Sequence, residues 1–371
     1  MKLFSLNTEL HNFETLKSFA QTFNLNDKDL ILTSRGIYKR SIEALQLKCR
    51  ILFHDDYGKG EPTDQKINAL ISDSKEEPFE RLIAIGGGSV LDISKILILK
   101  GVTDASDAFN RLVPLEKEHE LICIPTTCGT GSEVTNISIM EVPAKSTKIG
   151  LADPVLIPEH AVLIPELIHD LPYKNYLFSS VDALIHAIES YVSPKANSFT
   201  RMLALEATSM ILEVYKLILS NGEQIRHGHH KDMLLASTMA GIAFGNAGVG
   251  AVHALSYPLG GTYHVPHGEA NFQFFMAVFN KYNQKQPEGD LAQLGQTLAE
   301  IIGSEPDQVW ADLSNLLDSL ISRQPLHEFG MKESEIELWA DSVIEGQQRL
   351  LQNNYTELTR DDIRDIYKSL Y

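Results

Sequence analysis

The order of hydrophobic and polar positions divides the chain into two parts with different periodicities. In the first part, short aliphatic or β-branched runs alternate with amphipathic stretches. The runs lie at 29–33, 50–53, 81–85 and 121–124, with weaker ones at 137–142 and 161–164, and the amphipathic stretches lie near 12–23, 64–73 and 89–99. This alternation predicts βαβ units and a parallel sheet.

The second part of the chain, from about residue 166, has a helical pattern. Hydrophobic residues recur at helical period in five segments: 178–192, 200–220, 231–245, 291–302 and 307–321. Pro154, Pro158 and Pro165 punctuate the chain just before the change. We therefore predict an α/β domain over residues 1–160 and an all-helical domain over residues 161–371.

Length and charge narrow the class of protein. The 371 residues exceed one domain of about 100–200 residues. The net charge of −17 and the pI of about 5.2 argue against nucleic-acid or membrane partners, because an acidic surface repels phosphates and anionic lipids. The chain has neither an apolar signal segment at its start nor a run of about 18 apolar residues, so we expect a cytoplasmic protein.

A glycine-rich loop follows the predicted strand at 81–85. Gly86, Gly87, Gly88 and Ser89 precede the helical stretch at 89–99. Glycines let the backbone approach a phosphate, and the first N–H groups and the dipole of the helix attract it. The pattern GGGSxxD differs from the GxGxxG fingerprint, so a plain tight turn is the alternative. Asp92, in the first turns of the helix, complements the dipole or contacts a ligand.

A second loop, PTTCGTGSEVT at 125–135, follows the predicted strand at 121–124. Its hydroxyl groups can donate to phosphate or ribose without adding charge. An ordinary turn rich in Ser and Thr is the alternative interpretation. Two such loops at the ends of two strands favour a ligand site, because open α/β sheets bind ligands at the carboxyl ends of their strands.

Candidate metal ligands lie in the helical part. Asp182 and His186 have the i, i+4 spacing of one helix face, although alone they also fit a first-turn acid and a core histidine. His253, His264 and His267 lie in an apolar, glycine-rich stretch, where buried imidazoles need a partner. A carboxylate with imidazoles suits Fe²⁺, Zn²⁺, Co²⁺ or Ni²⁺.

Four blocks of sequence together resemble the iron-containing (group III) alcohol dehydrogenases. The blocks are GGGSVLDISK, PTTCGTGSEVT, DALIHAIESYVS and HALSYPLGGTYHVPHGEAN, in that order within residues 86–271. The resemblance implies a dehydroquinate synthase-like fold: an α/β nucleotide-binding domain, an all-helical metal-binding domain and an active site in the cleft between them.

The resemblance also implies roles for individual residues. It assigns the metal, Fe²⁺ or alternatively Zn²⁺, to Asp182, His186, His253 and His267. It assigns the nicotinamide coenzyme to Gly86, Gly87, Gly88, Ser89, Asp92, Thr126, Thr127, Thr135 and Lys148. We further expect a homodimer.

Two positions depart from the family pattern. Tyr257 stands where many relatives have a further histidine, so Tyr257 or His264 is the candidate proton relay. Ser34 and Arg35 stand where the family often has an acidic residue that rejects the 2′-phosphate of NADP, and an arginine can accommodate that phosphate. The resemblance implies NAD, and this departure keeps NADP as an alternative.

Nearly the whole chain is similar to the subgroup that interconverts 4-hydroxybutyrate and succinate semialdehyde with NAD(H). The alternatives are a butanol or 1,3-propanediol dehydrogenase of the same family and, in a different reaction class, a dehydroquinate synthase-like lyase. A non-catalytic metal- or nucleotide-binding protein is a third alternative. It fits poorly with two ligand loops beside a metal set.

Overall fold

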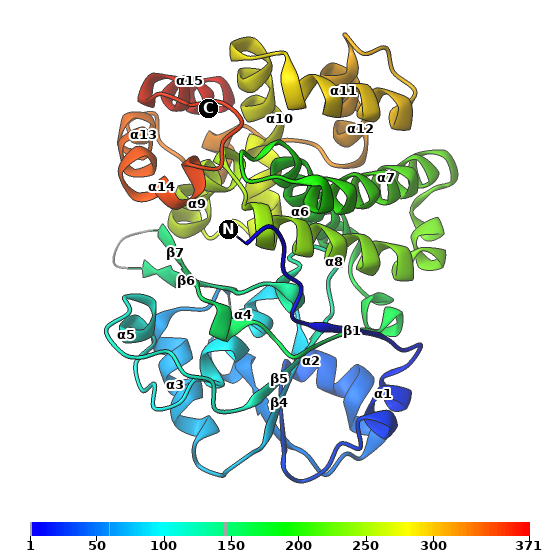
Figure 1. Ribbon diagram of the computed structural model, residues 1–371, viewed down its shortest axis with the longest axis vertical. Helices are drawn as coiled ribbons and strands as arrows, with labels where there is room; N and C mark the ends of the chain where they lie inside the picture. Colours follow the sequence, from blue (N-terminus) through cyan, green and yellow to red (C-terminus); the bar gives the residue numbers. More distant parts are fainter. Residues whose placement is uncertain (1, 59, 144–146) are drawn as a thin grey trace. The chain divides into compact units, whose positions relative to one another are not determined.

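A computed structural model describes residues 2–58, 60–143 and 147–371 of the chain. The chain forms two compact units (Figure 1). One unit is Leu6–Leu171. The other is Pro172–Tyr371 and also includes the N-terminal segment up to Ser5. The α/β unit extends past the predicted boundary at residue 160. The reason is that strand β8 (His160–Leu163) pairs inside the sheet of this unit.

The α/β unit contains a six-stranded sheet whose neighbouring strands all run parallel. In spatial order its strands are β1 (Glu9–Asn12), β8, β5 (Glu120–Pro125), β4 (Arg81–Gly86), β2 (Asp29–Thr33) and β3 (Arg50–Phe53). The four strongest predicted strands and β8 are confirmed. The hydrophobic pattern missed β1, because this edge strand is polar and mostly exposed.

The weak strand signal at 137–142 corresponds to β6 (Ile137–Val142), which lies outside the parallel sheet. It pairs antiparallel with β7 (Thr147–Ala152) in a separate two-stranded sheet. The weak strand prediction at 137–142 is therefore confirmed, and the strand belongs to a separate antiparallel pair.

Alternate residues of the central strands point to opposite faces of the parallel sheet. Leu82 and Ala84 pack into the core formed with α3 (Asp64–Ser74) and α4 (Gly88–Leu97). Ile83 and Ile85 pack into the core formed with α1 (Leu16–Thr22) (Figure 1). Burial on both faces explains why these strands read as continuous hydrophobic runs.

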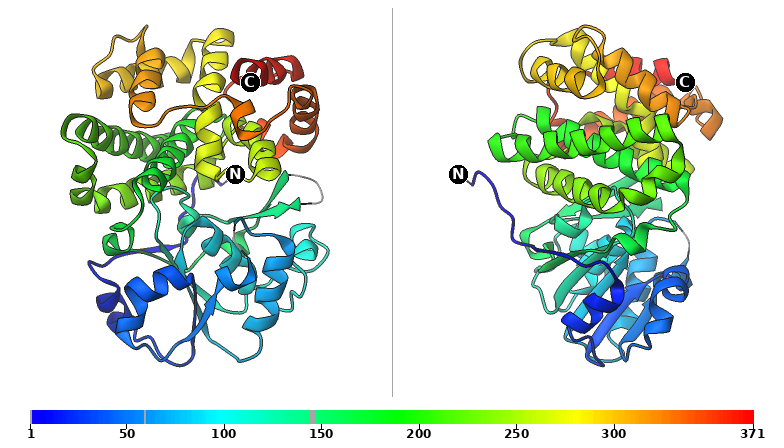
Figure 2. Two further views of the ribbon diagram at one scale, coloured as in Figure 1. Left: turned by 180° about the vertical axis from the view of Figure 1, so that it is seen from behind. Right: turned by 90° about the vertical axis from the view of Figure 1, so that its right-hand side faces the viewer.

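The second unit is helical, as predicted, and its residues from Pro172 on, all described, include no strand. Its helices are α6 (Tyr173–Val192), α7 (Ser198–Asn221), α8 (His230–Ala247), α9 (Ala251–Tyr263), α10 (His267–Lys285), α11 (Gly289–Ile302), α12 (Val309–Leu320), α13 (Glu335–Gly346), α14 (Gln348–Leu351) and α15 (Arg360–Leu370). Helices α6, α7 and α8 pack against one another, and α6 also packs against α10 (Figure 2).

The described residues contain no single helix that is long and apolar enough to cross a membrane. Helices α8 and α9 pass that test of length and composition only as a pair, and the pair is bent by 105°.

Candidate metal centre and coenzyme loops

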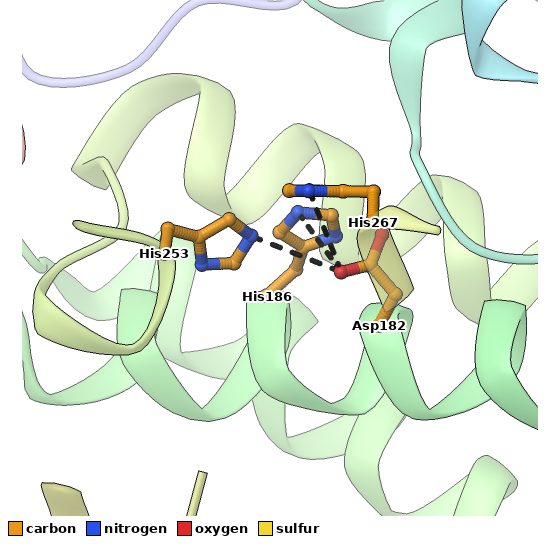
Figure 3. A group of neighbouring side chains, drawn as sticks. All are labelled: Asp182, His186, His253 and His267. Carbon is orange, nitrogen blue, oxygen red and sulfur yellow. Dashed lines mark ion pairs between the residues drawn. The ribbon is translucent and has the colours of Figure 1, made fainter. Parts of the chain in front are cut away.

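Four side chains from three helices converge in the helical unit (Figure 3). Helix α6 supplies Asp182 and His186, α9 supplies His253, and α10 begins with His267. One potential ligand atom of each residue lies within 4.8 Å of the others. The Nε2 atoms of His186, His253 and His267 lie 4.0, 3.8 and 3.7 Å from Oδ1 of Asp182. The structure thus brings together the four predicted ligands.

Helix packing explains why these residues meet. Helix α6 begins at Tyr173, so Asp182 lies in the middle of the helix and the interpretation of it as a first-turn acid is wrong. A Cβ atom on Gly268 would lie 2.3 Å from the backbone oxygen of Phe178. Only glycine therefore lets the start of α10 approach α6 this closely, and this approach places His267 beside Asp182.

The electrostatics of the cluster keep its carboxylate in the form that binds a cation. Burial of Asp182 acts to raise its pKa. His186, His267 and His253 oppose this effect and together hold the pKa of Asp182 below its ordinary value. Asp182 is thus an ionised, buried carboxylate, a species that proteins keep only beside compensating charge.

Glu189, one turn beyond His186, sets the orientation of His253. Its Oε2 atom lies 2.6 Å from Nδ1 of His253, and its Oε1 atom accepts the backbone N–H of Val252 at 2.8 Å. Because an ionised carboxylate only accepts hydrogen bonds, the neutral form of the imidazole, which is the form that binds a metal ion, carries its proton on Nδ1. The lone pair on Nε2 of His253 then points into the cluster, where that buried atom has no hydrogen-bond partner among the residues that the structure describes.

The buried Nε2 atom of His253 indicates that the site suits a metal ion. A buried acceptor without a partner costs free energy, and a divalent cation would remove that cost. A carboxylate behind a ligand histidine is the usual outer support of such sites. Three imidazoles and one carboxylate therefore fit a borderline ion such as Fe²⁺ or Zn²⁺.

Asn271 is a supporting residue that the sequence reasoning missed. Its Nδ2 group donates to Oδ1 of Asp182 at 2.7 Å, and its Oδ1 atom accepts the hydroxyl of Ser256. The available signal was its position four residues after His267, on the same face of α10.

The two candidate relay residues occupy different environments. Tyr257 is buried one turn after His253 on α9, and its ring centroid lies 6.4 Å from that of His267. His264 is exposed and adopts a left-handed backbone conformation (φ 54°) at the end of α9. Of the two candidates, Tyr257 is thus the buried one, with its ring near that of His267.

The two predicted coenzyme loops lie together in the α/β unit. Strands β4 and β5 are neighbours, and Gly86 pairs with Pro125 in register. A Cβ atom on Gly88 would lie 2.6 Å from the side chain of Thr130, and one on Gly87 would lie 3.4 Å from that of Thr127. Glycine is thus what allows the first loop to pack against the second.

Asp92 holds this pair of loops from inside. Its carboxylate accepts the hydroxyl of Ser132 at 2.6 Å and the backbone N–H of Ile139 at 2.9 Å. Lys95, fully buried, donates to Ser132 and Thr135. Burial raises the pKa of Asp92 and lowers that of Lys95, and the two charges oppose these shifts. These bonds favour a positioning role for Asp92 and Thr135.

Lys148 and Ser89 meet through a residue that the sequence did not single out. The ammonium group of Lys148 lies 2.9 Å from Oε1 of Glu61, and the hydroxyl of Ser89 lies 3.5 Å from Oε2. Lys148 is buried, so Glu61 supplies its counter-charge.

Comparison with known families covers almost the whole chain. Residues 8–165 match the model for iron-containing alcohol dehydrogenase, and residues 177–371 match that for the C-terminal part of the Fe-containing alcohol dehydrogenase family. The chain belongs to the iron-containing alcohol dehydrogenase family. It is therefore a metal-dependent, NAD-linked alcohol dehydrogenase, as the predicted family implied.

Individual family members resemble the chain to different degrees. It is 50% identical over 371 residues, all of both chains, to 4-hydroxybutyrate dehydrogenase of Clostridium kluyveri. It is 34% identical over 320 residues, 83% of this chain and 78% of the relative, to long-chain-alcohol dehydrogenase 1 of Geobacillus thermodenitrificans. The fold matches that of sulfoacetaldehyde reductase from Bifidobacterium kashiwanohense in complex with NAD⁺, with a TM-score of 0.84, 23% identity and coverage of 99% and 98%.

Proposed function

We propose that the protein is a 4-hydroxybutyrate dehydrogenase that uses NAD(H) to interconvert 4-hydroxybutyrate and succinate semialdehyde. The full-length identity to the Clostridium kluyveri enzyme supports the substrate. The buried Nε2 atom of His253, without a hydrogen-bond partner among the described residues, supports the metal-dependent chemistry. That nitrogen, facing Asp182, is the observation that carries the mechanism.

The proposed reaction is hydride transfer between the alcohol carbon and the nicotinamide. When bound, the divalent ion supplies Lewis-acid polarisation of the alcohol or carbonyl oxygen. Asp182, His186, His253 and His267 hold the ion, and Glu189 keeps His253 in the tautomer that offers Nε2. We assign the ion as Fe²⁺, with Zn²⁺ as the alternative.

Oxidation of the alcohol also releases a proton. We assign its transfer toward solvent to Tyr257, because Tyr257 is buried beside His267. His264 is the exposed alternative. Tyr257→Phe should lower kcat by about 10²-fold or more, as for loss of a general acid–base group. A comparable loss in His264→Gln and none in Tyr257→Phe would transfer the role to His264.

We assign coenzyme binding to the loops at the ends of β4 and β5. Gly87 precedes the first turn of α4, whose N–H groups suit a pyrophosphate. The contributing residues from the first loop are Gly86, Gly87, Gly88 and Ser89, those from the second are Thr126 and Thr127, and Lys148 reaches the same region. Asp92 and Thr135 position these loops.

We propose NAD rather than NADP, on the basis of the ends of β2 and β3. In this fold type, the adenosine ribose lies beyond the strand next to the glycine loop, and an arginine there can accept a 2′-phosphate. Strand β2 is that neighbour, and Arg35 follows it. The Arg35 guanidinium, however, binds both carboxylate oxygens of Asp56 at 2.6 Å and lies 4.3 Å above the ring of Phe53.

Asp55 adds a second carboxylate at the same place, because both of its oxygens accept the backbone N–H of Arg35 at 3.1 Å. Two carboxylates at this strand end repel a 2′-phosphate. They also already bind the guanidinium and the backbone N–H of Arg35, which are the groups that would bind the phosphate. Asp56→Asn should therefore raise kcat/KM for NADP relative to NAD. An unchanged ratio, or a wild-type preference for NADP, would contradict this assignment.

The substrate is tested by loading metal-depleted protein with Fe²⁺ or Zn²⁺ and following NADH formation. We expect turnover of 4-hydroxybutyrate to exceed that of 1-butanol and 1,3-propanediol, which are the substrates of the alternative family members. Equal rates on all three would refute the substrate assignment and leave the family assignment in place. A homodimer and a cytoplasmic location are further predictions of this proposal.

A further inference from the structure

A second group of metal-type ligands lies at one edge of the parallel sheet. Glu9 on β1 pairs in register with His160 on β8, and His11 follows Glu9 by two residues, on the same face of β1. Nε2 of His11 lies 3.0 Å from Nδ1 of His160. Oε2 of Glu9 lies 3.7 Å from the first nitrogen and 3.6 Å from the second.

The separations between the ring nitrogens and the carboxylate oxygen match those of the ligand set in the helical unit. There, the imidazole nitrogens lie 3.7 to 4.0 Å from the carboxylate oxygen of Asp182. At the sheet edge, the three potential ligand atoms also lie within 4.8 Å of one another. The chemistry is the same as well, since imidazole and carboxylate ligands suit borderline divalent ions.

The two imidazoles are held in place by groups outside the cluster. The second ring nitrogen of His160, Nε2, lies 3.3 Å from Oε1 of Glu120 on the neighbouring strand β5. Phe23 packs edge-on against His11 and His160, with ring centroids 5.2 and 5.4 Å apart. A carboxylate behind a histidine fixes the tautomer that offers the other nitrogen to a metal. Nδ1 of His160 therefore faces His11 and Glu9 and accepts a hydrogen bond from Nε2 of His11, and a metal ion bound by both nitrogens would displace that proton.

We propose that Glu9, His11 and His160 form a second divalent-cation site, distinct from the one at Asp182. It binds Zn²⁺, Co²⁺ or Ni²⁺ in preference to Mg²⁺ or Ca²⁺, because two of its three ligands are imidazoles. The side chains of Glu9, His11 and His160 are 72%, 28% and 20% exposed, so the ion enters from solvent and a water completes its coordination. Bound metal links the edge strand β1 to β8.

The experiment counts metal ions per chain. Chelator-treated full-length protein is equilibrated with Co²⁺ in excess Mg²⁺, and bound cobalt is measured by mass spectrometry after dialysis. We expect two ions in the wild type, one in His11→Ala/His160→Ala, one in His253→Ala and none in the triple variant. Cobalt absorption bands of the two single-site proteins should differ, because their ligand sets differ.

Two further variants separate a lost site from a lost fold. Glu9→Gln changes an exposed side chain and should weaken cobalt binding at this site while the circular dichroism spectrum stays unchanged. His119→Gln, at a half-buried histidine stacked on Phe79 in the same unit, should retain two ions. One ion in the wild type, or two in a folded His11→Ala/His160→Ala protein, would overturn the proposal.

Discussion

The proposed metal centre and the proposed coenzyme loops differ in what forms them. The metal centre consists of side chains from three helices, spread from Asp182 to His267 and held by Glu189 and Asn271. The loops at the ends of β4 and β5 depend on backbone shape, because Gly86 and Gly88 leave no room for a Cβ atom beside Val90 and Thr130. A single substitution should therefore remove the metal site and leave the fold intact. A substitution in the loops should instead disturb the local packing as well.

The strongest test of this contrast is His253→Ala. Removing one ligand should abolish ion retention and lower kcat/KM by about 10³-fold, the scale of losing electrostatic stabilisation in an active site. NAD binding, measured by calorimetry, should persist, because the loops lie in the other unit. His327→Ala, at an exposed histidine of the helical unit, should keep both ion and activity. Full ion retention in His253→Ala would remove this residue from the ligand set.

Lys95→Met tests the loops, where we expect a loss of stability and no loss of the metal ion. It leaves the mostly buried carboxylate of Asp92 without its fully buried cation, and breaking a buried pair costs about 3–5 kcal/mol of unfolding free energy. Since burial raises the pKa of Asp92, the folded variant favours the protonated acid, and its stability should fall as pH rises above about 4. Urea unfolding at several pH values measures this loss.

Lys100→Met is the matched control for that variant. Lys100 and Glu116 form an ion pair 3.8 Å long with both side chains about two-thirds exposed, and such pairs contribute about 0–1 kcal/mol. Ion content should be unchanged in both variants. A loss in Lys95→Met no larger than in Lys100→Met would show that the buried pair does not hold the loops.

Glu189→Gln should have the smallest effect of the three. The amide can still accept from His253, but it lacks the charge that strengthens Nε2 as a ligand, so metal affinity should fall by about 10–100-fold. Competition with a chelator measures the affinity. Glu213→Gln, at an exposed position of α7, should leave it unchanged. An equal effect of both substitutions would assign Glu189 a purely structural role.

Local sequence determined the elements and the reactive residue types. The strands at 29–33, 50–53 and 81–85 and the helical period after residue 166 follow from short-range geometry, which repeats within a few residues. The ligand types were also readable, because an apolar stretch that carries His253 and His267 needs a partner for them.

Only the tertiary structure decided which polar groups meet. The structure shows that Asp182 lies in the middle of a helix and that Glu189 and Asn271 support the proposed ligands. It also shows that Asp56 forms an ion pair with Arg35. These arrangements depend on packing between segments far apart in the chain. The same holds for β1, whose polar residues form a strand because β8 supplies the hydrogen bonds. Hydrophobic periodicity specifies a buried face, but hydrogen-bond partners are specified by the neighbours that the fold brings to that face.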